Sequence, residues 1–180
     1  MSRVVVLLRG VNVGKATRVP MAEFRALLDE LGCTDARTLL NSGNAVCEAP
    51  VGATTSQARR IHDALVARLA VDVAVIVKSA AEMAAIVRAN PFATEVADPS
   101  RLLVAFAPDA EALASLAPVA ALAVTPDAFV VGTHAAYLSC PDGILSSKAG
   151  EALLGTAGRQ ITTRNWATVL KLAALLDSTE

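Results

Sequence analysis

The chain has 180 residues, of which 54% are hydrophobic and 18% charged, and its formal net charge is −1. This length and apolar fraction are enough for one large domain or two small ones, and they exclude a disordered chain. The balanced charge excludes the overall positive charge typical of a nonspecific nucleic-acid binder, and no unbroken apolar stretch has the length of a membrane span. An apolar run follows Met1-Ser2-Arg3 without the pattern of a signal peptide, so we expect a cytoplasmic protein.

The first part of the chain alternates between strand and helix patterns. A continuous apolar run at the start is typical of a buried strand, and the turn-forming Asn41-Ser42-Gly43 predicts a hairpin. The expected elements are a strand at residues 4–8, a helix from Pro20 to Leu31, strands at 36–40 and 44–48, a helix across 58–69 and a strand at 73–77. This order is that of a ferredoxin-like fold, and it predicts a first subdomain of residues 1–78.

The second part of the chain, residues 79–180, is predicted to form another subdomain of similar order. It opens with a capping box of Ser79 and Glu82. The expected elements are a helix up to Asn90, a strand at 102–106, a short helix after Asp109, strands at 129–131 and 135–140, a helix across 144–154 and a last helix from about Arg164 to Leu176. The predicted fold class is therefore α+β, with a ferredoxin-like first half and a second half that ends in helices. Duplication and convergence both remain open as the origin of the similar order.

A polar segment directly after the first strand is the strongest candidate for a binding site. It reads RGVNVGK, and its candidate ligand-binding residues are Arg9, Gly10, Asn12, Gly14 and Lys15. The two glycines would let a ligand approach the backbone closely, while the arginine and lysine supply positive charge. The asparagine offers both a donor and an acceptor. An anionic ligand such as a phosphate or a carboxylate fits this chemistry.

The same segment does not have the spacing of a P-loop. A P-loop needs four residues between its first glycine and the Gly-Lys pair, followed by a serine or threonine whose hydroxyl binds magnesium. Here Val11-Asn12-Val13 alone separates the glycines, and Ala16 follows Lys15. The alternative interpretation, a glycine-rich connection with solvated charges, remains open.

Two further polar segments could complete this site. Ser42 and Asn44 belong to the expected hairpin turn, and Arg164 and Asn165 stand at the expected start of the last helix. A plain hairpin turn and an ordinary solvated helix face are the alternatives. The site hypothesis therefore requires all three segments to converge in space.

The other reactive residue types give weaker signals. The three cysteines, Cys33, Cys47 and Cys140, lack any metal-ligand spacing and are expected to be small buried apolar residues. Ser147 and Lys148 are neighbours in a helical pattern and would not face each other as a nucleophile and its base. No metal site is expected, and the sequence identifies neither catalytic residues nor a cofactor.

Several segments together resemble the bacterial domain-of-unknown-function family 1697. The resemblance lies in Leu7-Leu8-Arg9-Gly10-Val11-Asn12-Val13-Gly14, Ser42-Gly43-Asn44, Asn90-Pro91-Phe92 and Thr163-Arg164-Asn165-Trp166. It implies an α+β fold with a ferredoxin-like half. It implies no activity, cofactor or catalytic residue for this chain.

Three functions are compatible with these observations. The first is binding, with turnover left open, of a small anionic, phosphate- or nucleotide-like ligand at the Arg9–Lys15 segment. The second is an interaction or scaffold protein, or a homo-oligomer, without catalysis. The third, a nucleic-acid-binding module, is disfavoured because the expected central strands carry no aromatic residues on which bases could stack.

Overall fold

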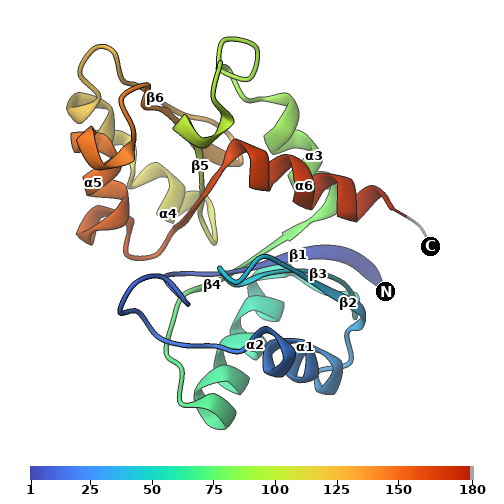
Figure 1. Cartoon of the computed structure of the whole chain (residues 1–180). Coiled ribbons are helices and arrows are strands. Elements are labelled where there is room, and N and C mark those ends of the chain that lie inside the picture. The colour runs from blue at the N-terminus through green and yellow to red at the C-terminus, as the bar shows by residue number, and fades with distance from the viewer. Residues whose placement is uncertain (179–180) are drawn as a thin grey trace. The chain divides into compact units, whose positions relative to one another are not determined.

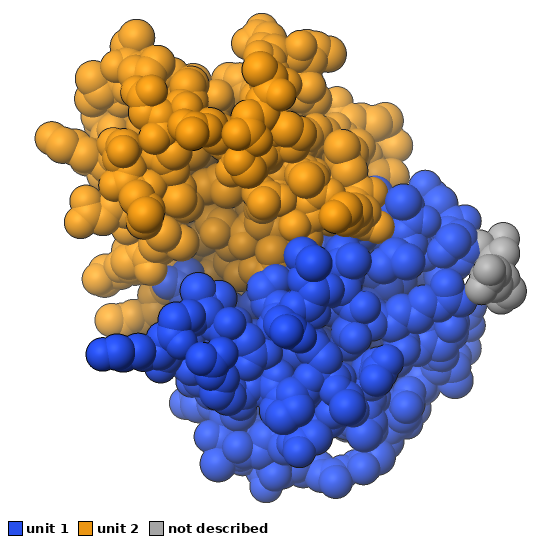
Figure 2. All heavy atoms as spheres, viewed as in Figure 1, with its two compact units in different colours: residues 1–83, 172–180 blue, residues 84–171 orange. Residues whose placement is uncertain are grey.

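The computed structural model describes residues 1–178. The chain divides into two compact units, one formed by residues 1–83 together with the chain from residue 172 onward, and the other by residues 84–171 (Figure 2). Each unit contains one four-stranded antiparallel sheet with helices, which confirms the α+β class. The domain boundaries expected from the sequence, 1–78 and 79–180, remain a prediction.

The first unit has the ferredoxin-like order of elements. They are β1 (Ser2–Leu8), α1 (Met21–Glu30), β2 (Thr34–Leu39), β3 (Asn44–Ala49), α2 (Thr54–Leu69) and β4 (Val75–Ser79). The sheet order is β2-β3-β1-β4, so β1 lies in the middle and pairs antiparallel with both β3 and β4. Each expected element is present with ends that agree within two residues, as is usual for helix and strand boundaries, except that α2 begins four residues earlier than expected.

One face of this sheet packs against α1 and α2 (Figure 1). Because side chains alternate along a strand, Val4, Val6 and Leu8 of β1 share that face and are fully buried beneath the helices. Phe24 and Leu28 of α1 join the same cluster. Helix α1 ends at Glu30, and the left-handed Gly32, with φ of +84°, follows two residues later, where glycine is favoured.

The second unit repeats this order. Its elements are β5 (Leu102–Phe106), α4 (Ala110–Ala114), β6 (Ala128–Val131), β7 (Ala135–Ser139), α5 (Lys148–Leu154) and β8 (Thr162–Asn165). Two helices, α3 (Ala80–Arg88) and α6 (Trp166–Asp177), have residues in both units. The sheet order β6-β7-β5-β8 matches that of the first unit. The chain ends in a helix as expected, but the fourth strand, β8, occupies residues that the sequence assigned to the beginning of that helix.

Local capping explains where several helices begin. The predicted capping box is present: the backbone N–H of Ser79 donates to Glu82 at 2.8 Å, and the N–H of Glu82 donates to the Ser79 hydroxyl at 3.2 Å. The helix expected across 144–154 is interrupted, because a 3₁₀ turn at Ile144–Ser146 precedes α5. Ser147 separates the two and caps α5, its Oγ accepting from the N–H of Gly150 at 3.0 Å.

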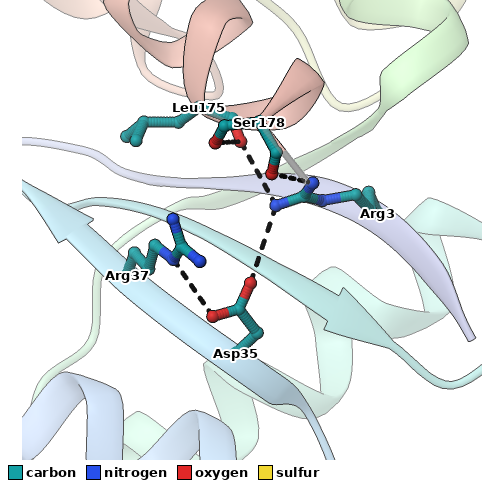
Figure 3. Close-up of polar contacts among 5 residues, drawn as sticks. All are labelled: Arg3, Asp35, Arg37, Leu175 and Ser178. Carbon is teal, nitrogen blue, oxygen red and sulfur yellow. Dashed lines mark hydrogen bonds and ion pairs between the residues drawn. The ribbon is translucent and has the colours of Figure 1, made fainter. Parts of the chain in front are cut away.

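Within the first unit, Arg3 binds the end of α6 (Figure 3). The Arg3 guanidinium donates to the carbonyl oxygen of Leu175, in the last turn of the helix, and to that of Ser178, the residue after the helix. Asp35 of β2 lies 3.6 Å from the same guanidinium and 3.0 Å from Arg37. A positive charge is favourable at a helix C-terminus, so Arg3 both satisfies these carbonyls and complements the helix dipole.

Within residues 1–178, no helix has the length and apolar character needed to cross a membrane.

Candidate functional site

The segment after β1 is closed on itself by the side chain of Asn12. Its Nδ2 donates to the carbonyl oxygen of Val19 at 2.7 Å, and its Oδ1 accepts from the Val19 N–H at 2.9 Å. The backbone N–H of Asn12 also donates to Thr17 at 2.9 Å. Asn12 has a φ of +56°, a left-handed conformation that asparagine tolerates better than most residues. We refer to residues 9–19 as the basic loop.

The basic loop is joined to the turn between β2 and β3. The Asn12 Nδ2 donates a second hydrogen bond, of 2.7 Å, to the carbonyl oxygen of Asn41. The backbone N–H of Leu8 donates to Gly43 at 2.8 Å. A β-carbon at Gly43 would lie 2.7 Å from both Leu8 Cβ and Val11 Cγ2, and φ there is +79°. Only glycine fits this approach, so the loop and the turn form one packed assembly.

The exposed part of this assembly carries positive charge and no acidic residue. Arg9, Lys15 and Arg18 belong to the basic loop, and the sequence has no Asp or Glu from Met1 to Ala22. Lys15 and Arg18 are exposed, while Arg9 is half-buried and its pKa is lowered by desolvation. An Arg18 N–H donates to the carbonyl oxygen of Gly14 at 2.9 Å, which holds that side chain against the loop.

The structure places the five predicted loop residues in two groups. Arg9, Lys15 and the two glycines are at least partly exposed, and both glycines have left-handed φ angles, +62° at Gly10 and +54° at Gly14. The amide of Asn12 instead uses its donors and its acceptor inside the assembly. Sequence reasoning passed over Arg18, although it is the next cation after Lys15 in the same acid-free stretch.

Ser42 and Asn44 lie in the turn that contacts the basic loop, as the site hypothesis requires. Asn44 is fully buried, and its Nδ2 donates to the carbonyl oxygen of Leu39 at 3.0 Å and to the Ser42 hydroxyl at 2.9 Å. These bonds fix the shape of the turn that receives Asn12. In this arrangement the Asn44 amide positions the backbone rather than presenting a polar group to solvent.

Arg164 and Asn165 belong to β8 of the second unit. The Arg164 guanidinium donates to the Thr162 hydroxyl at 2.6 Å and to the Thr163 carbonyl oxygen at 2.8 Å, and its burial lowers the pKa to about 10. Asn165 caps α6, its Oδ1 accepting from the N–H of Thr168 at 2.9 Å. Both residues therefore have structural roles within their own unit. Their participation in a site with the basic loop remains a prediction.

The structure reveals no metal centre near these residues. Across residues 1–178, no group of three or more His, Cys, Asp or Glu side chains is arranged to hold a metal ion.

Fold and site together define an α+β protein with two ferredoxin-like units and a cationic, acid-free loop after its first strand. The chain belongs to the family described as "Protein of unknown function (DUF1697)", whose sequence profile matches residues 1–137. No curated protein matches the sequence significantly. Among solved structures, that of the conserved bacterial protein SP0830 from Streptococcus pneumoniae is similar, with a TM-score of 0.81 and 22% identity over 98% of this chain and 99% of that chain. At this identity, the similarity shows a shared fold.

Proposed function

We propose that the protein binds a small anionic ligand with a phosphate-like group at the basic loop. The observation that carries the proposal is the clamp formed by Asn12, which fixes an acid-free cationic loop against the turn between β2 and β3. Lys15 and Arg18 supply exposed positive charges in the basic loop, and Arg9 supplies a partly desolvated positive charge at the start of the loop. Lysine and arginine are the side chains that phosphates and carboxylates prefer.

A fixed loop favours binding because the ligand need not order it. Ordering a flexible loop costs free energy on association, so a loop already held by hydrogen bonds keeps more of the interaction energy as affinity. The left-handed backbone at Gly10, Asn12 and Gly14 is part of that fixed shape. At Asn12, which is not a glycine, this conformation stores backbone strain, and such strain concentrates at ligand-binding sites. The loop contributes no nucleophile paired with a base, so the proposal is one of binding rather than catalysis.

The test is calorimetric titration of the full chain with inorganic phosphate, pyrophosphate and ADP, supported by thermal-shift measurements. A ligand that binds the native state raises the melting temperature by mass action. Lys15→Gln and Arg18→Gln should each weaken binding by about tenfold, since a charge-assisted hydrogen bond contributes roughly 1.5 kcal/mol or more. The matched control is Arg59→Gln, which removes an exposed cation from α2 and should leave affinity unchanged.

Two results would overturn the proposal. One is that none of the three anions binds. The other is that Arg59→Gln weakens binding as much as the loop variants, because the effect would then follow net charge rather than the loop. Salt-sensitive binding of single-stranded RNA without binding of the small anions would favour the nucleic-acid hypothesis instead.

A further inference from the structure

Two of the three cysteines lie together beneath the first sheet. Cys33 directly precedes β2 and Cys47 lies in β3, where Thr34 pairs with Glu48. Both cysteines belong to the apolar cluster between the sheet and its helices, and both line the same cavity. The third, Cys140, is buried in the second unit.

A small cavity opens beside this pair of thiols. Its lining includes Cys33, Cys47, Gln57 and Arg60, and its volume is about 10 Å³. That is about the least volume that holds one water molecule. Arg60 is an exposed residue, so the cavity lies next to solvent, and its guanidinium donates to the carbonyl oxygen of Leu31 at 3.1 Å.

Gln57 brings an unsatisfied polar atom to the same cavity. It is 7% exposed, and its Nε2 donates to the carbonyl oxygen of Pro50 at 2.7 Å. Its Oε1 is buried and has no hydrogen-bond partner in the structure. A buried acceptor without a partner is costly, and a small hydroxyl-bearing molecule in the cavity would satisfy it.

The two thiols have different acidities. The hydrogen bond from Cys47 and the positive charge of Arg60 lower the pKa of Cys33 to about 7, against the opposing effects of burial and of Asp29. The pKa of Cys47 is raised strongly, because it donates that hydrogen bond and is buried, with Asp29 and Asp35 adding negative charge nearby. Near neutral pH the pair therefore combines a thiolate with a protonated thiol.

We propose that Cys33 and Cys47 form a peroxide-reactive dithiol, with Cys33 as the attacking thiolate and Cys47 as the resolving thiol. The Cys33 thiolate attacks one oxygen of hydrogen peroxide, the O–O bond breaks, and Cys33 sulfenic acid and hydroxide form. The Cys47 sulfur then attacks the sulfenic sulfur, giving a Cys33–Cys47 disulfide and water, with the Cys47 proton leaving on that water. The Gln57 Oε1 accepts a hydrogen bond from the peroxide.

The backbone at this position can accommodate the disulfide. A disulfide requires its Cα atoms to approach within about 7 Å, whereas the diagonal neighbours of an antiparallel pair stand about 7–8 Å apart, so the backbone has to move slightly. β2 is an edge strand, and its register with β3 is irregular between Thr34 and Arg37. Asp35 at this irregularity has a φ of +50°. A small shift of Cys33 at the start of β2 is therefore all that bond formation requires.

The experiment exposes the reduced full-length protein to hydrogen peroxide and follows each cysteine by mass spectrometry, with and without a sulfenic-acid trap. We expect a product that has lost two hydrogens, with the cross-link mapped to Cys33 and Cys47. Cys47→Ser should stop at the trapped sulfenic acid on Cys33, and Cys33→Ser should form neither product. The matched control is Cys140→Ser, which should behave as the wild type.

The rate provides a second readout that needs no variant. Cys33 should react at least about tenfold faster than Cys140, whose pKa burial raises to about 11, because the thiolate is the reactive form. The Cys33 rate should increase as the pH rises through about 7 and then level off as the thiolate becomes fully populated. Oxidation of Cys33 no faster than that of Cys140 would overturn the proposal, and so would a cross-link that forms only between two chains. Binding of anions at the basic loop is measured separately and has no bearing on either outcome.

Discussion

Removing the Asn12 side chain should release the basic loop from the turn between β2 and β3. Asn12→Gly is the most informative substitution, because glycine adopts the φ of +56° without steric penalty. It therefore removes the three side-chain hydrogen bonds to Val19 and Asn41 without straining the backbone. Asn41→Ala is the matched control, because Asn41 contributes only its main-chain carbonyl to the bond with Asn12.

The expected loss follows from those three hydrogen bonds. Each intramolecular hydrogen bond contributes roughly 0.5–1.5 kcal/mol, which gives a range of about 1.5–4.5 kcal/mol. The bond to Asn41 is exposed and belongs at the lower end, because water replaces it readily. We therefore expect a loss of about 2 kcal/mol, which corresponds to about a thirtyfold increase in the opening of the loop.

Hydrogen exchange of individual amides is the appropriate assay, because the loop can open without unfolding the rest of the chain. The N–H groups of Val19 and Leu8 report on the two sides of the clamp. Both should exchange about thirtyfold faster in Asn12→Gly and at the wild-type rate in Asn41→Ala. A change of less than about threefold at Val19 would refute the reasoning, since it would mean that other contacts hold the loop.

Two more predictions concern stability. In denaturant unfolding, Gly43→Ala should lower the free energy of unfolding by about 2–4 kcal/mol, because the new β-carbon would lie 2.7 Å from Leu8 and Val11. The control is Gly10→Ala, which has a similar φ but no atom within 4 Å of the new β-carbon, and it should cost only about 1 kcal/mol. Equal losses would mean that the close approach is unimportant. The hydrogen bonds of His62 to Asp72 and to Asp63 raise the pKa of the imidazole in the folded protein. The contribution of protonated His62 to the free energy of unfolding is therefore fully present below about pH 6.5, and it is lost as the pH rises through the raised pKa of the folded state. The wild type should therefore exceed His62→Gln in stability by more at pH 5.5 than at pH 8, and an equal difference at both values would contradict this assignment.

Elements governed by short-range chemistry were predictable from the sequence. The capping box of Ser79 and Glu82 begins a helix where expected, and Asp109 caps α4 by accepting from the N–H of Ala112 at 2.8 Å. These signals depend on residues three apart, so the sequence contains all the information that they need. The same holds for the continuous apolar run that predicts β1.

Strand β8 was not predictable in the same way. Thr162–Asn165 is a short polar segment that can be extended or helical, and pairing with β5, where Arg164 lies opposite Val104, makes it a strand. The residues of β5 lie far away in the sequence, so local patterns cannot reveal that choice. The break at Ser147 is instead a local signal, because its hydroxyl accepts from the N–H of Gly150, three residues further on.

For the site, the sequence by itself determined the composition of the basic loop: its cations, its glycines and its lack of acidic residues. Only the tertiary structure decided which polar groups remain available, because the partners of Asn12 and Asn44 are backbone atoms brought close by folding. It also decided that Cys33 and Cys47, unremarkable in sequence spacing, share one cavity. Hydrogen bonding and proximity between distant segments arise from sheet register and helix packing, and a sequence read residue by residue does not contain them.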